Sequence, residues 1–426
     1  MKESSIQKFR FLKIRLLILC LILAGFSTYL ILDYYGPHEI MVKSDVVMGM
    51  PVLRVENEEL IVQEYDKEGS LWVTRGMWAY QMKPQKNKFV RRFHIPTGPS
   101  IFWLRNFSII RRLTLRPECV ELLIMPDGKA LAMSAGRIWY QPDYNEKMKE
   151  TFRLRHYGIG IGQGIRNDGW DILKDGKILF GEYFRNINRS NVRLFCSEDN
   201  GRSWQVAHEF SPGKIRHIHA IQQDPFEDKA WILAGDNKHE PMISWTDNGG
   251  YTLNIIGQGA QKYRATQLVF TGNFLFWGAD TDHPEDGGIY RYDRKLKRIE
   301  KFSSTKGVVL YATRLTGGTI VMSTQSTKGS LSKKETKTRL IIIQDEKNVV
   351  SIVFGEEASR RKYAKLRFQR RQGNNSLVIS VLNHKEYNND LLIIPEYSLK
   401  GFIDRNHSTP NLSLRVKKKL LSPMTR

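Results

Sequence analysis

Residues 197–204 read SEDNGRSW and directly follow the apolar run VRLFC at residues 192–196. Aspartate or asparagine beside glycine favours a tight hairpin, because the short side chain bonds turn amides while glycine supplies a positive φ. Trp204 is expected to pack beside this turn. A second stretch, TDNGGY at residues 246–251, keeps the Asp and Gly but lacks the flanking Ser and Trp. The two stretches predict hairpin turns in neighbouring β units.

Similar turns and short apolar strands repeat along the chain on both sides of these hairpins. The turns that precede an apolar strand are Glu68-Gly69, Asp127-Gly128, Asp175-Gly176, Glu227-Asp228, Thr271-Gly272, Gly317-Gly318 and Asn374-Asn375. Most of these strands are followed by another short strand, and few long amphipathic helices interrupt them. Spacings of roughly 45 to 60 residues match four-stranded propeller blades. The sequence therefore predicts an all-β, seven-bladed β-propeller, with six or eight blades as alternatives.

An uncharged and almost wholly apolar run occupies residues 16–32. With Ile14 included, it approaches the ~20 residues that a helix needs to cross a bilayer. Residues 1–15 carry several Lys and Arg residues, so this segment is expected to stay cytoplasmic while the rest is exported. A cleaved signal peptide is the alternative, although no small-x-small cleavage site follows the run. We predict a single-pass membrane protein with an extracytoplasmic propeller.

The other predicted boundaries are a stalk at 33–55, the propeller at 56–405 and a basic tail at 406–426. A polar, basic run from 326 to 337 predicts an exposed loop in the sixth unit. Cys119 and Cys196 fall in strand-like runs, where buried free thiols are favoured over a disulfide. The chain lacks zinc-binding spacing, and we predict neither a metal nor a cofactor.

The chain of 426 residues has a formal net charge of +22, which favours an anionic partner. Acidic polysaccharide, lipid headgroups and nucleic acid all fit this charge. Export and the scattered placement of the basic residues disfavour nucleic acid. A polysaccharide or glycoconjugate is therefore the expected partner, with a solvated basic surface as the structural alternative.

Charged and aromatic residues gather at the predicted starts of the innermost strands. Aligning the units on their turns places Asp168, His217 and Arg264 at roughly equivalent positions. His219 lies two residues beyond His217, and residues two apart on a strand face the same side. Both histidines are therefore expected to look into the central channel. Tyr311 falls near the same place in the sixth unit.

Carboxylates end the second strands of three consecutive units, in the runs GEY (181–183), GD (235–236) and GAD (278–280). A charge after a buried strand needs solvent, a partner or a ligand. Bonds to loop amides and satisfied core histidines are the structural alternatives to a functional site. Because loops before the first strand and after the second share one face, a joint site is expected. The residues assigned to catalysis are Glu182, His217, His219, Asp236, Asp280 and Tyr311, and those assigned to substrate binding are Asp168, Arg264 and Asp282.

The octet at 197–204 fits the pattern S-x-D-x-G-x-[ST]-W and resembles the Asp-box of BNR/Asp-box propellers. This group includes sialidases, related glycosidases and noncatalytic propellers. Sialidases use an arginine triad, a tyrosine activated by a glutamate, and an aspartate acid/base. The resemblance implies Arg264, Tyr311, Glu182 and Asp280 as counterparts by residue type. Where sialidases carry an early Arg-Ile-Pro motif, this chain reads FHIP at 93–96.

The leading hypothesis is a membrane-anchored, exported carbohydrate-active propeller that acts on an anionic surface or extracellular polysaccharide. Hydrolysis would use two opposed carboxylates, whereas eliminative cleavage of a uronate would use a His or Tyr base with a cation near the carboxylate. Arg264 would engage the substrate carboxylate in either case. The alternative is a noncatalytic glycan-binding or assembly protein in polysaccharide export or envelope organisation, because a propeller alone does not imply catalysis.

Overall fold

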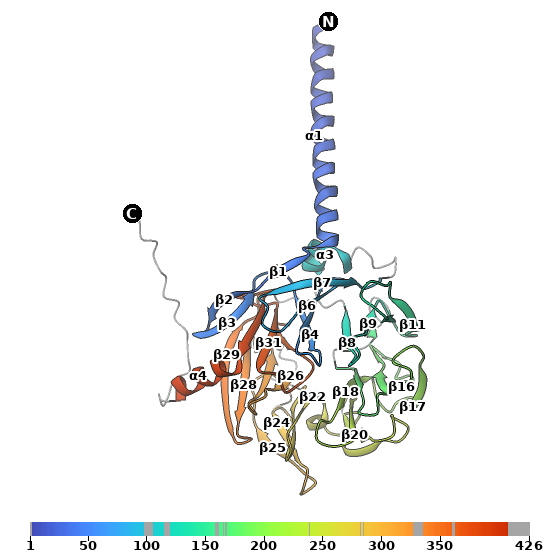
Figure 1. Ribbon diagram of the computed structural model, residues 1–426, viewed down its shortest axis with the longest axis vertical. Coiled ribbons are helices and arrows are strands. Elements are labelled where there is room, and N and C mark those ends of the chain that lie inside the picture. The colour runs from blue at the N-terminus through green and yellow to red at the C-terminus, as the bar shows by residue number, and fades with distance from the viewer. Residues whose placement is uncertain are drawn as a thin grey trace.

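The computed structural model describes residues 2–97, 105–114, 120–157, 162–164, 166, 168–237, 239–281, 283, 285–326, 335–359 and 363–407. Seven sheets of four or five antiparallel strands surround a central axis (Figure 1). The prediction of an all-β, seven-bladed propeller is confirmed. The short apolar runs form the strands because each is long enough for one blade and ends at a turn signal.

The first three blades use strands from β1 to β17. Blade 1 contains β4 (Ile61–Tyr65), β5 (Leu71–Arg75), β6 (Trp78–Met82) and β7 (Lys88–His94), with β1 (Glu39–Met41) at its outer edge. Blade 2 contains β8 (Glu121–Ile124), β9 (Ala130–Ser134), β10 (Arg137–Gln141) and β11 (Lys149–Arg153). Blade 3 contains β13 (Trp170–Ile172), β14 (Ile178–Gly181), β16 (Val192–Ser197) and β17 (Gln205–Phe210). A separate ribbon pairs β12 (Gly162–Gly164) with β15 (Tyr183–Phe184).

The next three blades follow the same order from the channel outward. Blade 4 contains β18 (Ile218–Gln223), β19 (Ala230–Ala234), β20 (Met242–Thr246) and β21 (Asn254–Gln258). Blade 5 contains β22 (Ala265–Phe270), β23 (Phe274–Ala279), β24 (Ile289–Asp293) and β25 (Arg298–Ser303). Blade 6 contains β26 (Val308–Arg314), β27 (Ile320–Gln325), β28 (Lys337–Gln344) and β29 (Asn348–Glu356).

Blade 7 combines strands from both ends of the chain. It contains β30 (Lys365–Phe368), β31 (Ser376–Leu382), β32 (Leu391–Pro395), β3 (Met50–Val55) and β2 (Lys43–Val47). Leu53 pairs with Ile393 in the ladder between β3 and β32. The stalk predicted at 33–55 is therefore wrong. Its residues end a helix and then form β1, β2 and β3, because pairing with distant strands closes the ring.

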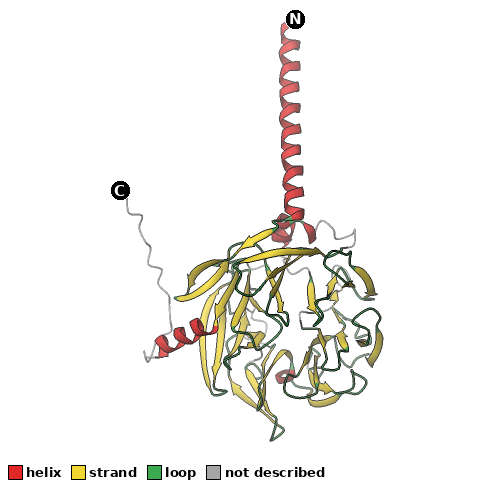
Figure 2. Cartoon of the chain, viewed as in Figure 1, coloured by secondary structure: helices red, strands yellow, loops and turns green. Residues whose placement is uncertain are grey.

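Few helices accompany the strands (Figure 2). Within the described residues they are α1 (Lys2–Tyr35), α3 (Ser108–Thr114), α4 (Glu396–His407) and the 3-10 turn η2 (Gln261–Tyr263). α1 extends away from the propeller at blade 1, and its segment Ile18–Tyr35 is long and apolar enough to cross a membrane (Figure 1). This segment is a candidate membrane span or signal sequence.

The apolar core lies between the blades. In the first gap, Trp72 and Phe93 of blade 1 pack with Leu122 and Trp139 of blade 2. Each of the other gaps holds a comparable cluster among the described residues. The innermost strands of blades 4 and 5 are almost wholly buried, whereas the outermost strands of blades 3 and 4 expose much of their length. Burial of apolar surface between neighbouring sheets therefore holds the ring together.

Two glycines allow close approach between adjacent blades at the ends of second strands. A Cβ on Gly181 would lie 2.5 Å from Ile218 Cγ2, and one on Gly278 would lie 2.2 Å from Val309 Cβ. The innermost strand of the next blade thus packs directly on these glycines. The residues that follow each glycine are consequently brought beside the start of that next strand.

The octet at 197–204 forms the turn between the two outer strands of blade 3. Asp199 accepts hydrogen bonds from the backbone N–H groups of Arg202 and Ser203 at 3.0 and 2.9 Å. Trp204 packs edge-on against Phe180, with ring centroids 4.8 Å apart. The turn lies on the propeller face opposite the loops that leave the second strands, because consecutive strands are antiparallel.

The second turn, at 246–252, has the same bonding with other residues. Asn248 Oδ1 accepts the N–H of Thr252 at 3.1 Å, and Thr246 Oγ1 accepts the N–H of Gly250 at 3.0 Å. Asn248 therefore stands where Asp199 stands in blade 3, while Asp247 is exposed. Asp247, which the sequence comparison matched to the aspartate of the octet, is therefore not the residue that bonds the turn amides.

Several remaining predictions fall partly outside the described residues. Cys196 is buried and free, whereas Cys119 lies outside them. Residues 327–334 of the predicted loop and 408–426 of the predicted tail also lie outside them. The first two residues of that tail belong to α4.

Candidate functional site

One face of the propeller, here called the site face, carries the loops that start the first strands and those that leave the second strands. On this face His217 precedes β18 and Arg264 precedes β22. The N–H of Gly235 donates to His217 O at 3.0 Å, and the N–H of Asp280 donates to Arg264 O at 2.7 Å. These backbone bonds set each strand-end acid beside the start of its own innermost strand.

His217, His219 and Asp236 form a buried cluster at the centre of the site. The Nε2 atoms of the two histidines lie 3.1 Å apart, and His219 Nε2 lies 3.0 Å from Asp236 Oδ1. His217 Nε2 lies 3.5 Å from Asp236 Oδ2. The exposed fractions of the three residues are 4%, 1% and 9%, in that order. Two imidazoles and one carboxylate, all able to bind or release a proton, are thus in contact and almost completely buried.

The other ring nitrogen of each histidine faces a backbone carbonyl. His217 Nδ1 lies 2.9 Å from Phe184 O, and His219 Nδ1 lies 3.1 Å from Ala265 O. Because a carbonyl oxygen only accepts, these contacts place a proton on Nδ1 of each ring. The rings are thereby fixed with their Nε2 atoms turned toward each other and toward Asp236.

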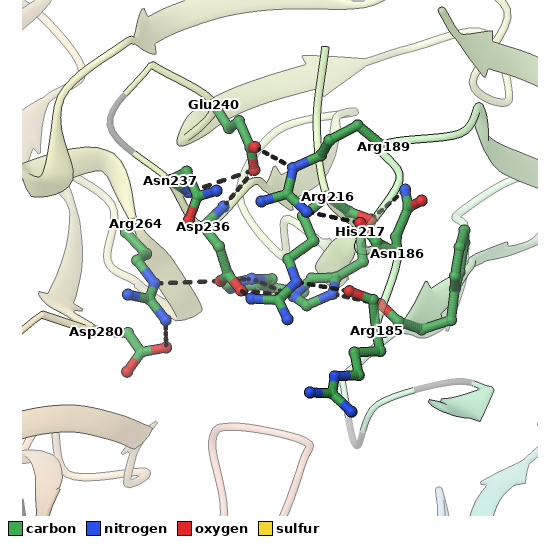
Figure 3. A network of polar contacts seen from close by, with 12 residues as sticks. Arg185, Asn186, Arg189, Arg216, His217, Asp236, Asn237, Glu240, Arg264 and Asp280 are labelled. Atoms are coloured by element: carbon green, nitrogen blue, oxygen red, sulfur yellow. Dashed lines mark hydrogen bonds and ion pairs between the residues drawn. The ribbon is translucent and has the colours of Figure 1, made fainter. Parts of the chain in front are cut away.

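Arginines lie on either side of the Asp236 carboxylate (Figure 3). Arg216 donates to Asp236 Oδ2 at 2.8 Å, and Arg264 Nε lies 3.2 Å from Oδ1. The second nitrogen of the Arg264 guanidinium lies 3.4 Å from Asp280 Oδ2. Both arginine side chains keep more than a quarter of their surface exposed. They are therefore accessible cations at the edge of a buried cluster.

A ring of further polar contacts positions Asp236 (Figure 3). Glu240 Oε2 accepts the N–H of Asp236 at 3.2 Å, and its other oxygen accepts Arg189 Nε at 2.6 Å. Gln261 donates to Asp236 O at 3.0 Å. Glu240 and Gln261 thus hold the loop backbone and leave the Asp236 side chain to the histidines and arginines.

Arg166 and Tyr183 complete the site from blade 3. Arg166 lies 5.7 Å from the Tyr183 ring centroid, and that ring lies 4.1 Å from the His217 ring. Burial lowers the pKa of Arg166, but nearby groups including Tyr183, Asp236 and Asp280 outweigh it and raise the pKa. Arg166 is therefore a half-buried cation near the tyrosine and the acids.

Titration of the cluster follows from burial and mutual contact. Burial lowers the pKa of His219 to about 4, which keeps its imidazole neutral near pH 7. Arg216 and Arg264, one on each oxygen of Asp236, keep that residue in its carboxylate form. The site therefore combines a carboxylate with a neutral imidazole.

The sequence-predicted residues separate into two groups in space. His217, His219, Asp236, Arg264 and Asp280 form the connected network just described. Of the remaining described candidates, Glu182 pairs with Arg155, whereas Asp168 and Tyr311 interact electrostatically with Arg166. Asp282 lies outside the described residues.

Glu182 follows β14 but points to a different partner. Its two oxygens accept Arg155 Nε and a second Arg155 nitrogen at 2.8 and 2.9 Å. One of the same oxygens accepts the N–H of Arg193 at 2.8 Å. Glu182 therefore fixes the approach to blade 3 through a two-point ion pair.

Asp168 lies deeper in the channel than the histidine cluster, because its carbonyl oxygen accepts the N–H of Ile221, two residues beyond His219 in β18, at 2.6 Å. Burial raises its pKa to about 7, against the opposing charges of Arg370, Arg367 and Arg166. Tyr311 is the fourth residue of β26 rather than its first, and it is one of the groups that raise the pKa of Arg166. Both residues are buried beside the channel, below the site face.

Sequence reasoning missed Arg166, Tyr183 and Arg216. Tyr183 directly follows one of the strand-end acids, and Arg216 directly precedes the first histidine. Arg166 lies two residues before Asp168. A search for charged or aromatic neighbours of each aligned position would have found all three.

Comparisons with known proteins give a fold and no family. No family model and no curated protein matches the chain. An oligogalacturonate lyase from Vibrio parahaemolyticus is similar in structure, with a TM-score of 0.55 and 10% identity over 84% of this chain and 99% of that one. A GH74 xyloglucanase from Xanthomonas campestris has a TM-score of 0.51 and 10% identity over 80% of this chain and 52% of its own.

A further similar structure is an oligogalacturonate lyase in complex with manganese, with a TM-score of 0.53 and 10% identity over 85% of this chain and 98% of that one. At this identity each likeness shows a shared propeller fold. Several of the structural neighbours are carbohydrate-active enzymes.

Proposed function

We propose that this chain is a carbohydrate-active propeller that cleaves an anionic, uronate-containing polysaccharide by β-elimination on the site face. The observation that carries the proposal is the charge of the site. Three guanidinium groups, from Arg166, Arg216 and Arg264, surround two carboxylates, from Asp236 and Asp280. An anionic ligand would balance the excess positive charge, and guanidinium groups bind carboxylates well. The net charge of +22 favours the same class of substrate.

Elimination fits the site better than hydrolysis by two carboxylates. A glycosidase acid must hold a proton for the leaving oxygen. Both oxygens of Asp236 face cations or imidazoles, and both oxygens of Glu182 face Arg155. Neither residue offers a free oxygen for that proton. Asp236 and Glu182 therefore suit the positioning of cations.

The elimination would proceed with these roles. Arg264 and Arg166 would bind the uronate carboxylate, which makes the neighbouring C–H more acidic. Tyr183 would take that proton as general base through its phenolate form, because its ring lies beside the Arg166 cation and the His217 ring. The C–H electron pair would form a C=C bond and expel the glycosidic oxygen, which would take the same proton back from the Tyr183 hydroxyl and restore the phenolate.

The structural neighbours support a carbohydrate substrate in general terms. Two of them are named oligogalacturonate lyases and one a xyloglucanase. A lyase that acts on a galacturonate oligosaccharide needs to bind a sugar carboxylate, which agrees with the arginines of this site. The likeness in fold does not extend this argument to a particular sugar or linkage.

The proposal places the propeller outside the cytoplasm, anchored by α1. No residue of the apolar segment Ile18–Tyr35 is buried within the protein, as expected for a helix whose surroundings are lipid. The basic residues before it favour a cytoplasmic N-terminus. Such a protein would meet polysaccharide at the outer surface of that membrane.

The test is kinetic and uses the full-length protein in detergent with panels of uronate-containing and neutral polysaccharides. Tyr183→Phe is expected to lower kcat by about 100-fold or more, the usual contribution of a general base. Arg264→Ala is expected to raise KM as well, since it removes a carboxylate-binding cation. Tyr251→Phe, an exposed tyrosine on the opposite face, is the matched control.

Two results would contradict the proposal. Unchanged turnover in Tyr183→Phe would remove the assigned base. Tight binding of uronate polysaccharide by the wild-type protein with no shortened product would favour the noncatalytic glycan-binding alternative.

A further inference from the structure

His217, His219 and Asp236 carry an inference that goes beyond the proposed function. With Nδ1 of each ring donating to a carbonyl, both Nε2 atoms present lone pairs. These lone pairs face each other at 3.1 Å, and one faces a carboxylate oxygen at 3.0 Å. Three electron-rich atoms converge in a buried space, and a cation between them would turn each repulsive contact into an attractive one.

The spacing of the three atoms matches a shared metal ion. Nitrogen and oxygen ligands lie about 2.1 Å from a transition metal, which puts neighbouring donors about 3.0 Å apart in an octahedron and about 3.4 Å apart in a tetrahedron. The two Nε2 atoms lie 3.1 Å apart, His219 Nε2 lies 3.0 Å from Asp236 Oδ1, and His217 Nε2 lies 3.5 Å from the other carboxylate oxygen, Oδ2. The ligand atoms of this trio all lie within 4.8 Å of one another.

The surroundings of the histidines also have the form of a metal site. Metal-binding histidines usually donate their second ring N–H to a carbonyl or carboxylate, which fixes the ring orientation. Phe184 O and Ala265 O receive these bonds here, from two different blades. The Asp236 carboxylate is held in turn by Arg216 and Arg264.

We propose that His217, His219 and Asp236 bind a divalent transition-metal cation. Two imidazoles and one carboxylate favour Mn²⁺, Fe²⁺ or Zn²⁺ over Mg²⁺ and Ca²⁺, which prefer oxygen ligands alone. The trio occupies one side of the ion and leaves the other positions for water or a ligand.

The positive charge of the neighbouring arginines opposes metal binding. It also couples metal binding to the binding of an anionic ligand. Arg166, Arg216 and Arg264 already exceed Asp236 and Asp280 by one positive charge, so a bare dication adds repulsion. A carboxylate-bearing ligand that contacts the arginines would offset that charge. Uronate and metal are therefore expected to bind more tightly together than separately, and this second expectation alone rests on the proposed function.

The metal site is tested with full-length protein in detergent, stripped with a chelator and then titrated with Zn²⁺ or Mn²⁺ alone. Calorimetry is expected to give about one ion per chain, bound at least about tenfold more tightly than Mg²⁺. His219→Ala and His217→Ala are each expected to weaken binding by about 10-fold to 100-fold or more. His208→Ala, which removes a partly buried histidine of β17, is expected to bind like wild type.

If either histidine variant fails to fold, a second measurement on the wild-type protein tests whether the histidines bind the metal. Wild-type protein is produced with isotope-labelled histidine nitrogen and loaded with Mn²⁺. Pulsed electron paramagnetic resonance should then show coupling between the Mn²⁺ electron spin and the histidine nitrogen nuclei. Absence of stoichiometric binding by wild type would overturn the proposal, as would equal binding in His219→Ala. A proton shared between the two rings would then account for the contact. Because the titrations use metal alone, the metal site can stand even if no glycan is cleaved.

Discussion

The Asn248 side chain makes three hydrogen bonds in the turn between β20 and β21. It accepts the N–H of Thr252 at 3.1 Å and contacts the hydroxyls of Thr246 and Thr252 at 2.9 and 2.7 Å. We expect Asn248→Ala to lower the free energy of unfolding by about 1 to 2 kcal/mol, the usual worth of one or two such bonds. Denaturant unfolding of the full-length protein measures this change.

Asp247→Ala is the matched control, because Asp247 is the neighbouring exposed residue of the same turn. Its free energy of unfolding should stay within about 0.5 kcal/mol of wild type, as for most surface substitutions. Equal losses in the two variants would contradict the assignment of the turn to Asn248.

Residues whose contacts lie within a short segment could be predicted from the sequence, whereas residues whose contacts join distant segments could not. The octet at 197–204 could be predicted as a turn, because Asp199 bonds amides only three and four residues away. His217 and His219 could be placed on one side of a strand for the same local reason. The roles of Arg166 and Tyr183 depend on contacts between segments whose separation in space no local pattern fixes.

At the scale of elements, the fit between β23 and β26 depends on the lack of a side chain at Gly278. A Cβ there would approach Val309 to 2.2 Å. We expect Gly278→Ala to lower the free energy of unfolding by about 1 to 3 kcal/mol, since overpacking forces neighbouring strands to shift.

Gly272→Ala is the control within the same blade, because a Cβ at that turn would meet no atom within 4 Å. Its thermal unfolding should stay close to wild type. A loss in Gly272→Ala as large as that in Gly278→Ala would show that close approach of the blades is not the cause.

The innermost strand of blade 3 is expected to make stability depend on pH through Asp168. Burial raises its pKa from 3.8 to about 7, despite Arg370, Arg367 and Arg166, while Glu121 adds to the rise. The folded state therefore binds a proton that the unfolded state releases between about pH 4 and 7, so stability falls as pH rises through this window.

Asp168→Asn removes this titration. Relative to the variant, wild type is expected to lose stability by about 1 kcal/mol per pH unit across the window. Denaturant unfolding at a series of pH values measures the difference. Parallel pH profiles of the two proteins would contradict a raised pKa at Asp168.

The strands themselves could largely be predicted from sequence, and the element that failed shows why. The turns at Asp127-Gly128 and Gly317-Gly318 mark hairpins whose two strands are neighbours in the chain. β3 instead pairs with β32, so that Arg54 meets Asp390 at 2.7 Å across most of the chain. Nothing within residues 33–55 indicates this partner, so the local sequence alone predicts a stalk.

At the scale of the whole molecule, the ring is closed by that N-terminal pairing. We expect a fragment of residues 36–407 to be soluble and to unfold cooperatively. A fragment of residues 56–407 lacks β1, β2 and β3 and exposes the edge of β32, so it should aggregate or unfold without cooperativity. Comparable cooperative unfolding of both fragments would contradict closure by β3.

The end of α1 is tied to blade 1 by specific contacts. Ser108 N–H donates to Asp33 Oδ2 at 2.7 Å, and Trp78 Nε1 donates to Tyr34 O at 2.7 Å. The helix is thus a fixed extension of the propeller (Figure 1). If α1 crosses a membrane, the propeller and its site face are held at a set orientation to that membrane.

The central claim is that the site face cleaves a uronate polysaccharide by elimination. The most direct measurement is mass spectrometry of the oligosaccharides that the full-length protein releases in water enriched in heavy oxygen. Elimination predicts products with an unsaturated end and no heavy oxygen, in amounts that fall sharply in Tyr183→Phe. Saturated products that carry heavy oxygen would show hydrolysis instead and would contradict the account.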